Sequence, residues 1–200
     1  MTQYDNEKKI RPDTNFKQQF IIIIAFSFFF AIDCFLKSFS EFFKNGRTDL
    51  MSFIRIRNSF LSVIHAFITG LGAFGWFVLF ACTDLLNDII YSENYNAYQL
   101  LAFSTGIHVI LPYCAGYFIH DIYHNICSGV TRRSGEIILH HFTVIVCFEV
   151  VICWRILVPY ALFGLLMEIN SIFLHGRQIL LYFNTSPFSS IYRANYHANV

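Results

Sequence analysis

An almost entirely apolar stretch near the N-terminus of this 200-residue chain reads Phe20-Ile-Ile-Ile-Ile-Ala-Phe-Ser-Phe-Phe-Phe-Ala-Ile32. It carries no charge and forms the core of a mostly apolar run over residues 16–36. A helix needs about 20 such residues to cross the hydrocarbon layer of a membrane. The run therefore predicts a membrane-spanning helix. A cleaved signal peptide is the alternative, but no small-x-small pattern follows the apolar core, so we favour a retained helix.

The rest of the chain has the same apolar character. Apolar residues make up 56% of it and charged residues only 14%, whereas roughly a quarter of the residues of soluble domains are charged. Further apolar runs predict spans at residues 59–82, 99–119, 137–154 and 157–183. The predicted fold class is therefore an all-α, polytopic transmembrane helical bundle of about five spans.

The net charge and the cysteines bear on possible partners and on disulfide or metal sites. Proteins that bind nucleic acid are usually strongly basic, and a net charge of +1 is not, so no nucleic-acid partner is expected. The six cysteines are scattered, without a C-x-x-C pattern, and are interpreted as small buried hydrophobes. Basic residues between the first two spans, together with Arg132 and Arg133 after the third, favour a cytosolic position for both loops. The basic N-terminal tail opposes that orientation.

Ionisable residues within spans are costly and usually face the interior of a bundle. Here they concentrate in the second half of the chain, where Asp121 ends the third span and His140 and His141 open the fourth. Glu149 lies deeper in the fourth span, and Glu168 lies in the fifth. Earlier in the chain, Asp33, His65 and His108 are expected to be isolated.

Helical spacing sorts the polar residues of the fifth span. Glu168 and His175 are seven apart and share one face, while Asn170 and Arg177 share another. A short link joins the fourth and fifth spans, so we expect these two helices to pack antiparallel, with Glu168 near Glu149. One cluster is then predicted at the cytosolic side, formed by Asp121, His124, His140, His141, His175 and Arg177. The alternative for its members is a hydrated position in the headgroup layer, as at an ordinary helix end.

Four segments follow one another in a specific order: Gly116-Tyr-Phe-Ile-His-Asp121, Arg132-Arg-Ser-Gly-Glu136, His140-His141 and Glu168-Ile-Asn-Ser-Ile-Phe-Leu-His-Gly-Arg177. Their spacing resembles the TLC domain, which ceramide synthases share with other lipid-related membrane proteins. Arg57-Asn-Ser-Phe-Leu-Ser-Val-Ile-His65 looks like the start of that domain. The resemblance covers roughly residues 55–198. We expect residues 1–54 to hold an N-terminal tail, the first transmembrane helix and a basic loop, and residues 55–200 to form the TLC domain.

The resemblance is closest to the small TLC-domain proteins that regulate membrane fluidity and phospholipid composition, and the chain departs from its relatives at three places. Ceramide synthases carry two acidic residues three apart where this chain has Glu168 and Ser171. His124 stands where the fluidity-regulating relatives tend to have an Asp. In those relatives the stretch resembling Ile191-Tyr-Arg-Ala-Asn-Tyr-His-Ala-Asn199 leads into further spans, so the domain is expected to be C-terminally incomplete.

The resemblance implies a membrane protein that regulates phospholipid acyl composition and fluidity. Such a protein limits polyunsaturated chains in phospholipids, phosphatidylethanolamine in particular, and serves phospholipid homeostasis and plasma membrane organisation. The alternative is a lipid acyltransferase, ceramide-synthase-like or acting on lysophospholipids. In that case His140 or His141 would be the base or nucleophile, and Asp121 or Glu168 its partner. The residues expected to bind lipid are His124, Asn170, Ser171, His175 and Arg177.

The expected partners are membrane lipids and lipid-remodelling enzymes. The expected location is the plasma membrane, with the endoplasmic reticulum as the alternative. No cofactor is expected, apart from acyl-CoA if the acyltransferase alternative holds. The histidine clusters superficially suggest a di-iron hydroxylase or desaturase, but the H-x-x-H-H spacing is absent, so no metal site is predicted. Buried acids such as Glu149 and Glu168 also line ion paths in membrane proteins, so a channel or transporter remains an alternative function.

Overall fold

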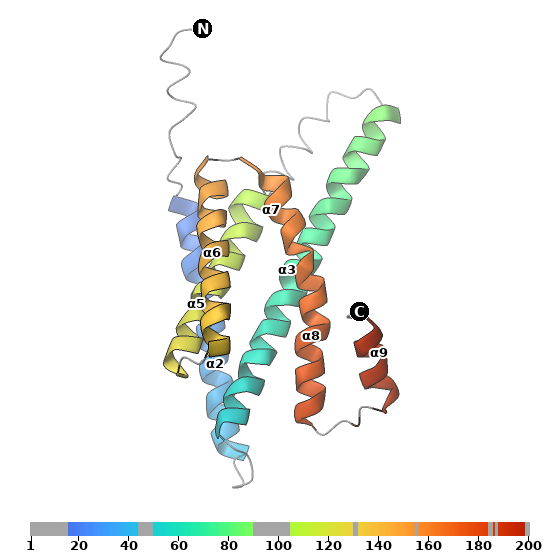
Figure 1. Cartoon of the computed structure of the whole chain (residues 1–200). Helices are drawn as coiled ribbons and strands as arrows, with labels where there is room; N and C mark the ends of the chain where they lie inside the picture. Colours follow the sequence, from blue (N-terminus) through green and yellow to red (C-terminus); the bar gives the residue numbers. More distant parts are fainter. Residues whose placement is uncertain are drawn as a thin grey trace.

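A computed structural model of the chain describes residues 16–43, 50–89, 105–129, 132–154, 156–183, 186 and 188–198. Within these ranges the regular structure is helical and contains no strand, which confirms the predicted all-α class. Figure 1 shows the helices in chain order: α2 (Phe16–Phe43), α3 (Leu50–Ile89), the π-helix η1 (Gly106–Ile110), α5 (Leu111–Cys127), α6 (Arg132–Trp154), α7 (Val158–Leu165), α8 (Met167–Tyr182) and α9 (Ser190–Ala198).

Four segments of the described residues are long and apolar enough to cross a membrane: Phe16–Phe39, Phe53–Leu79, Ser134–Trp154 and Val158–Tyr182. They correspond to the first, second, fourth and fifth predicted spans. The last combines α7 and α8, which are separated by a turn at Leu166. The first residues of the predicted third span lie outside the described residues. Its helix, η1 followed by α5, continues to Cys127, well beyond the predicted end at residue 119.

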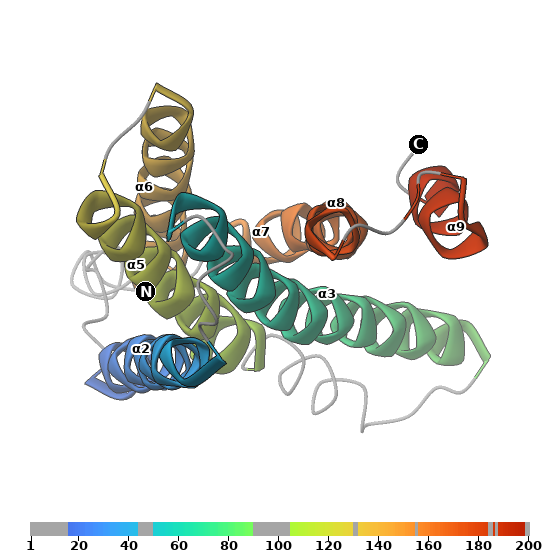
Figure 2. The same cartoon turned by 90° about the horizontal axis from the view of Figure 1, so that it is seen from below.

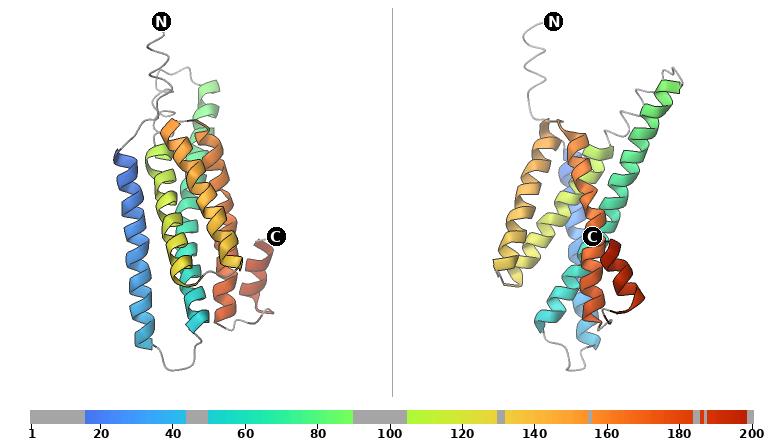
Figure 3. Two further views of the ribbon diagram at one scale, coloured as in Figure 1. Left: turned by 60° about the vertical axis from the view of Figure 1, so that its left-hand side comes forward. Right: turned by 45° about the vertical axis from the view of Figure 1, so that its right-hand side comes forward.

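The helices form a bundle in which α2 packs along α5, α5 along α6, and α3 along α8 (Figures 2 and 3). The expectation that the fourth and fifth spans pack against each other holds for α7, which contacts α6, but not for α8, whose main partner is α3. A small residue lies at the α3–α8 contact. A Cβ atom added to Gly70 of α3 would lie 3.2 Å from the backbone nitrogen of Ile169 on α8, so glycine allows the two helices to approach closely without displacing a neighbour.

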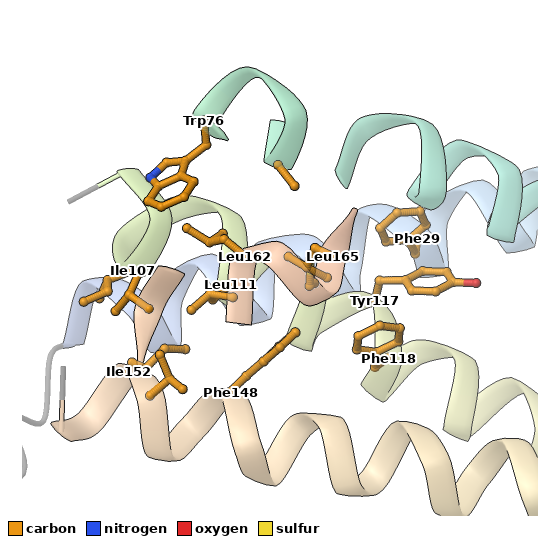
Figure 4. Close-up of a cluster of buried hydrophobic side chains, with 14 of the residues drawn as sticks. Phe29, Trp76, Ile107, Leu111, Tyr117, Phe118, Phe148, Ile152, Leu162 and Leu165 are labelled. Carbon is orange, nitrogen blue, oxygen red and sulfur yellow. The ribbon is translucent and has the colours of Figure 1, made fainter. Parts of the chain in front are cut away.

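One apolar core joins the first helix to the rest of the bundle (Figure 4). Phe29 of α2 is fully buried against Tyr117 of α5, with ring centroids 4.8 Å apart. A Cβ atom on Gly116 would lie 2.5 Å from the carbonyl oxygen of Ile22, so the backbones of α2 and α5 nearly touch. The first predicted span is thus an integral part of the bundle.

The outer faces of the spanning helices carry large apolar side chains. On α2, for example, Phe20 is 63% exposed and Phe28 is 45% exposed. Lipid accepts such side chains, whereas water would drive them to aggregate. The several apolar helices and their apolar outer faces identify a multi-pass membrane protein.

Candidate functional site

The centre of the site is a buried pair formed by a carboxylate and an imidazole. Nδ1 of His141, on α6, lies 2.9 Å from Oδ2 of Asp121, on α5. The Asp121 side chain is 3% exposed and that of His141 is 16% exposed. The packing of α5 along α6 brings these side chains together, and the ring of Phe118 stacks on the imidazole with centroids 4.6 Å apart. The sequence prediction placed both residues in one cluster, and the structure joins them.

Two asparagines hold the Asp121 carboxylate in place. Asn125, one turn later on α5, donates from its side-chain nitrogen to Oδ2 of Asp121 at 2.9 Å and to the carbonyl oxygen of Asp121 at 2.8 Å. Asn58 of α3 also hydrogen-bonds with the Asp121 side chain. The alternative in which Asp121 merely ends its helix in the headgroup layer does not fit, because Asp121 is buried within α5.

The pairing assigns different roles to the two imidazole nitrogens of His141. Because Nδ1 faces the carboxylate, Nε2 is the nitrogen left to accept a proton or to attack an acyl group. The carboxylate can orient the ring and stabilise an imidazolium. His140 occupies a different environment: it is exposed, and its ring centroid lies 5.6 Å from that of His141.

Two of the predicted residues, Glu168 and His175 on α8, lie near the Asp121–His141 pair. His175 is close enough to Asp121 and His141 for their charges to interact, and its side chain hydrogen-bonds with Gln178. Glu168 interacts electrostatically with His141. Glu168 and His175 therefore face the same place, as their spacing of seven predicts.

The two deep glutamates have different partners. Glu168 hydrogen-bonds with Ser171 and interacts with His141. Glu149 accepts a hydrogen bond, at 3.5 Å, from the side chain of Gln19 on α2. The position of Glu168 near Glu149 stays a prediction.

The other predicted face of α8 stands apart from the pair. Asn170 is exposed and Arg177 is half-buried. Within the described residues, the structure gives neither side chain a polar contact with Asp121 or His141. Asn170 and Arg177 lie on a separate face of α8, and their role in lipid binding stays a prediction.

A second charged centre lies beside the first and joins three helices. Asp33 Oδ1, on α2, lies 2.8 Å from Nε of Arg57 on α3 and 3.5 Å from Nδ1 of His124 on α5. The Asp33–Arg57 contact is an ion pair, and in both contacts the geometry departs from that of a well-aligned hydrogen bond. The expectation that Asp33 is isolated is wrong, because its partners come from helices distant in the sequence. His124 belongs to this centre, so the predicted single cluster divides in two.

His65 is a further residue of the site that the sequence prediction set apart. It is 1% exposed, and its ring stacks on Tyr117 with centroids 3.8 Å apart and planes at 10°. Its ring centroid lies 5.2 Å from that of Phe118, the residue that stacks on His141, so His65 lies close behind the pair. Tyr117 in turn donates from its hydroxyl to Oγ of Ser62 at 2.9 Å. The Arg57–His65 segment, which resembles the start of the TLC domain, could have pointed to His65. Its partners could not be predicted from that segment, because they lie on other helices.

Among the described residues, no three His, Cys, Asp or Glu side chains come together closely enough to hold a metal ion.

These features define a multi-pass helical membrane protein with a carboxylate–imidazole pair inside its bundle. The chain belongs to the TLC domain family, which matches residues 55–197. TLC domain proteins are membrane proteins tied to lipid metabolism.

Three relatives illustrate the similarity. The chain is 33% identical to TLC domain-containing protein 2 of Danio rerio over 141 residues, which are 70% of this chain and 51% of the relative. It is 30% identical to TLC domain-containing protein 1 of Homo sapiens over 154 residues, covering 77% and 57% of the two chains. It is 34% identical to TLC domain-containing protein 1 of Gallus gallus over 147 residues, covering 73% and 53%. The chain thus spans about half the length of these relatives. No solved structure matches it.

Proposed function

We propose that this protein regulates the acyl composition of membrane phospholipids and thereby the fluidity of the membrane. In this proposal it limits polyunsaturated chains in phospholipids, phosphatidylethanolamine in particular. The observation that carries the proposal is the Asp121–His141 pair, held inside the bundle of a TLC domain. The resemblance of the sequence to the fluidity-regulating members of the family supports the choice of phospholipid.

The position of the pair supports a ligand that arrives from the lipid phase. Asp121 is almost fully buried, but His141 is partly exposed, and the facing residues Glu168 and His175 are half-buried. These residues belong to helices of a membrane bundle, so a molecule that reaches His141 has to enter among apolar helices. The ligand therefore needs an apolar part that fits between the helices and a polar group that meets His141. A lipid with a polar group near its ester linkages has both.

We further propose that the protein acts in the plasma membrane, on phospholipids themselves or together with lipid-remodelling enzymes. Imaging of the tagged full chain against plasma membrane and endoplasmic reticulum markers tests the location. Confinement to the endoplasmic reticulum would overturn this part of the proposal.

The main experiment is a lipid profile of cells that lack the protein. Cells are fed a polyunsaturated fatty acid and complemented with wild type, His141→Ala or Cys147→Ala. Cys147 is exposed on the same helix as His141 and serves as the matched control. We expect polyunsaturated phosphatidylethanolamine to rise on loss of the protein, and to return to normal with wild type and Cys147→Ala but not with His141→Ala. Unchanged phospholipids with altered ceramides would overturn the proposal.

A lipid acyltransferase is the second candidate, and the geometry of the Asp121–His141 pair is the observation that favours it. In such a reaction Nε2 of His141 would take the proton of a lysophospholipid hydroxyl as that oxygen attacks the thioester carbon of acyl-CoA. The carbon–sulfur bond then breaks, and the leaving thiolate takes the proton from the imidazolium. Because Glu168 has Ser171 as its partner in place of a second acid, we favour a lysophospholipid over a sphingoid base as the acceptor.

The purified protein separates the two candidates. It is incubated with labelled acyl-CoA and lysophosphatidylethanolamine, with His141→Ala as the negative control. Transfer that depends on His141 establishes the acyltransferase. No transfer, in a protein that still corrects the lipid profile of cells, establishes a regulator that works through other enzymes.

A further inference from the structure

We propose that Asp33, on the first helix, is a positioning residue for the Asp121–His141 pair: it holds the cationic side chain of Arg57 away from Asp121. This inference rests on the proposed function only for the importance of that pair. It assigns a role in the site to a residue outside the segment that matches the TLC domain.

Two helices, α3 and α5, supply partners to both carboxylates, Asp33 and Asp121, whereas α6 supplies His141 to Asp121 alone. Arg57 and Asn58 are consecutive on α3, and they reach different acids: Arg57 contacts Asp33, whereas Asn58 hydrogen-bonds with Asp121. On α5, Asp121 and His124 lie about one turn apart. His124 contacts Asp33, and its charge also acts on Asp121.

Asp33 and the two side chains that contact it are largely buried. The side chain of Asp33 is 14% exposed, that of Arg57 is 10% exposed, and that of His124 is 4% exposed. Charges so little exposed to solvent interact strongly and need a partner. Asp33 supplies that partner at 2.8 Å from Arg57.

Removal of the Asp33 charge would turn Arg57 toward the other carboxylate. Arg57 is always charged, has five donors and is long enough to choose another acceptor. Asp121 is the carboxylate held by its neighbour Asn58, so it is the acceptor at hand. An Arg57–Asp121 ion pair would compete with His141 for the carboxylate and would release the imidazole. Asp33 therefore keeps Asp121 available to His141.

The test compares the effects of removing the anion and removing the cation. The full chain is prepared in detergent micelles with ¹⁵N-labelled histidine, and the imidazole signals of His141 are assigned by their loss in His141→Gln. Asp121→Asn gives the signals of a broken pair. We expect Asp33→Asn to shift the His141 signals toward that position, Arg57→Gln to leave them near wild type, and the double variant Asp33→Asn/Arg57→Gln to restore them.

A purely structural ion pair predicts something else. Losing either partner would leave one buried charge unpaired, so both single variants would disturb the bundle alike. Equal shifts in Asp33→Asn and Arg57→Gln, or no shift in Asp33→Asn, would overturn the proposal. If Asp33→Asn does not fold, Asp33→Glu decides. It keeps the charge and should leave the His141 signals in place, whereas a shift as large as that of Asp121→Asn would refute positioning by charge.

The same variants in the lipid-profile assay link the inference to function. Asp33→Asn should fail to correct the lipid profile, and Arg57→Gln should correct it. If wild type itself does not alter phospholipids, the proposed function fails. The ¹⁵N signals still decide whether Asp33 positions the pair, because they do not depend on lipid activity.

Discussion

The close approach of α2 and α5 at Gly116 leads to a sharp stability prediction. In Gly116→Ala the new Cβ atom would lie 2.5 Å from the carbonyl oxygen of Ile22 and 2.6 Å from Cβ of Ala25. The first of these atoms belongs to the backbone of a long helix, so it cannot rotate away as the end of a side chain can. The two helices have to move apart along their interface.

The size of the effect follows from two opposing contributions. Overpacking of a tight interface costs about 1–3 kcal/mol, and contact with backbone points to the upper end of that range. Replacing glycine by alanine inside a helix returns about 1 kcal/mol. The net loss is about 2 kcal/mol, which for a chain of this length corresponds to a fall in Tm of roughly 4–8 °C.

Thermal unfolding of the purified full chain in detergent measures this change. The matched control is Gly75→Ala on α3, because a Cβ atom added there meets no atom within 4 Å. The control gains helix propensity without overpacking, so its Tm should rise by roughly 2–4 °C. Equal shifts in the two variants would refute the reasoning, since they would show that the α2–α5 contact at Gly116 carries no steric constraint.

Two further predictions concern the core. Phe29→Ala should lower the free energy of unfolding by about 3–5 kcal/mol because Phe29 is fully buried, whereas Phe28→Ala, at a 45% exposed position facing outward, should change it by about 0.5 kcal/mol or less. Similar losses in these two variants, measured by the same thermal unfolding, would contradict the burial of Phe29. Tyr117→Phe removes the hydroxyl that donates to Ser62 Oγ and should cost about 1 kcal/mol. A rise in Tm in that variant would show that the hydrogen bond does not stabilise the bundle.

The helices of this chain could be predicted from sequence because membrane-spanning length and apolar composition are local properties. The same reasoning misplaced the end of the third helix. The apolar run weakens after residue 119, yet α5 continues to Cys127 and buries Asp121 and His124. A polar residue that finds partners on other helices does not end its own helix, and those partners cannot be read from the local pattern.

Helix partners were harder to predict than helices. A short link between two spans suggests that they pack together, and α7 does contact α6, but α8 packs on α3, where Gly70 lets the backbones approach closely. The Asp33–Arg57 contact is non-local in the same way, since it joins residues of α2 and α3 that belong to no common motif. The Asp121–His141 contact was easier to foresee, because the two residues lie on consecutive helices, α5 and α6, which pack along each other.

The interface between α2 and α5 connects the stability of the bundle to its charged centres. Three contacts follow one another with a spacing of four residues on both helices: Gly116 meets Ala25, His120 lies beside Phe29 with ring centroids 6.2 Å apart, and His124 contacts Asp33. The residue numbers rise together, by four at each step, on both helices. This means that α2 and α5 run parallel and in register, with one row of contacts along their facing sides.

A displacement at one end of this row must therefore reach the other end, because a helix is a stiff rod over two turns. If Gly116→Ala separates the helices, Asp33 has to move away from His124, whose contact is already long at 3.5 Å. The variant would then show both a lower Tm and a weakened second centre. Gly116 thus allows α2 and α5 to pack closely. Through the register of the two helices it also sets the position of the Asp33 carboxylate on α2.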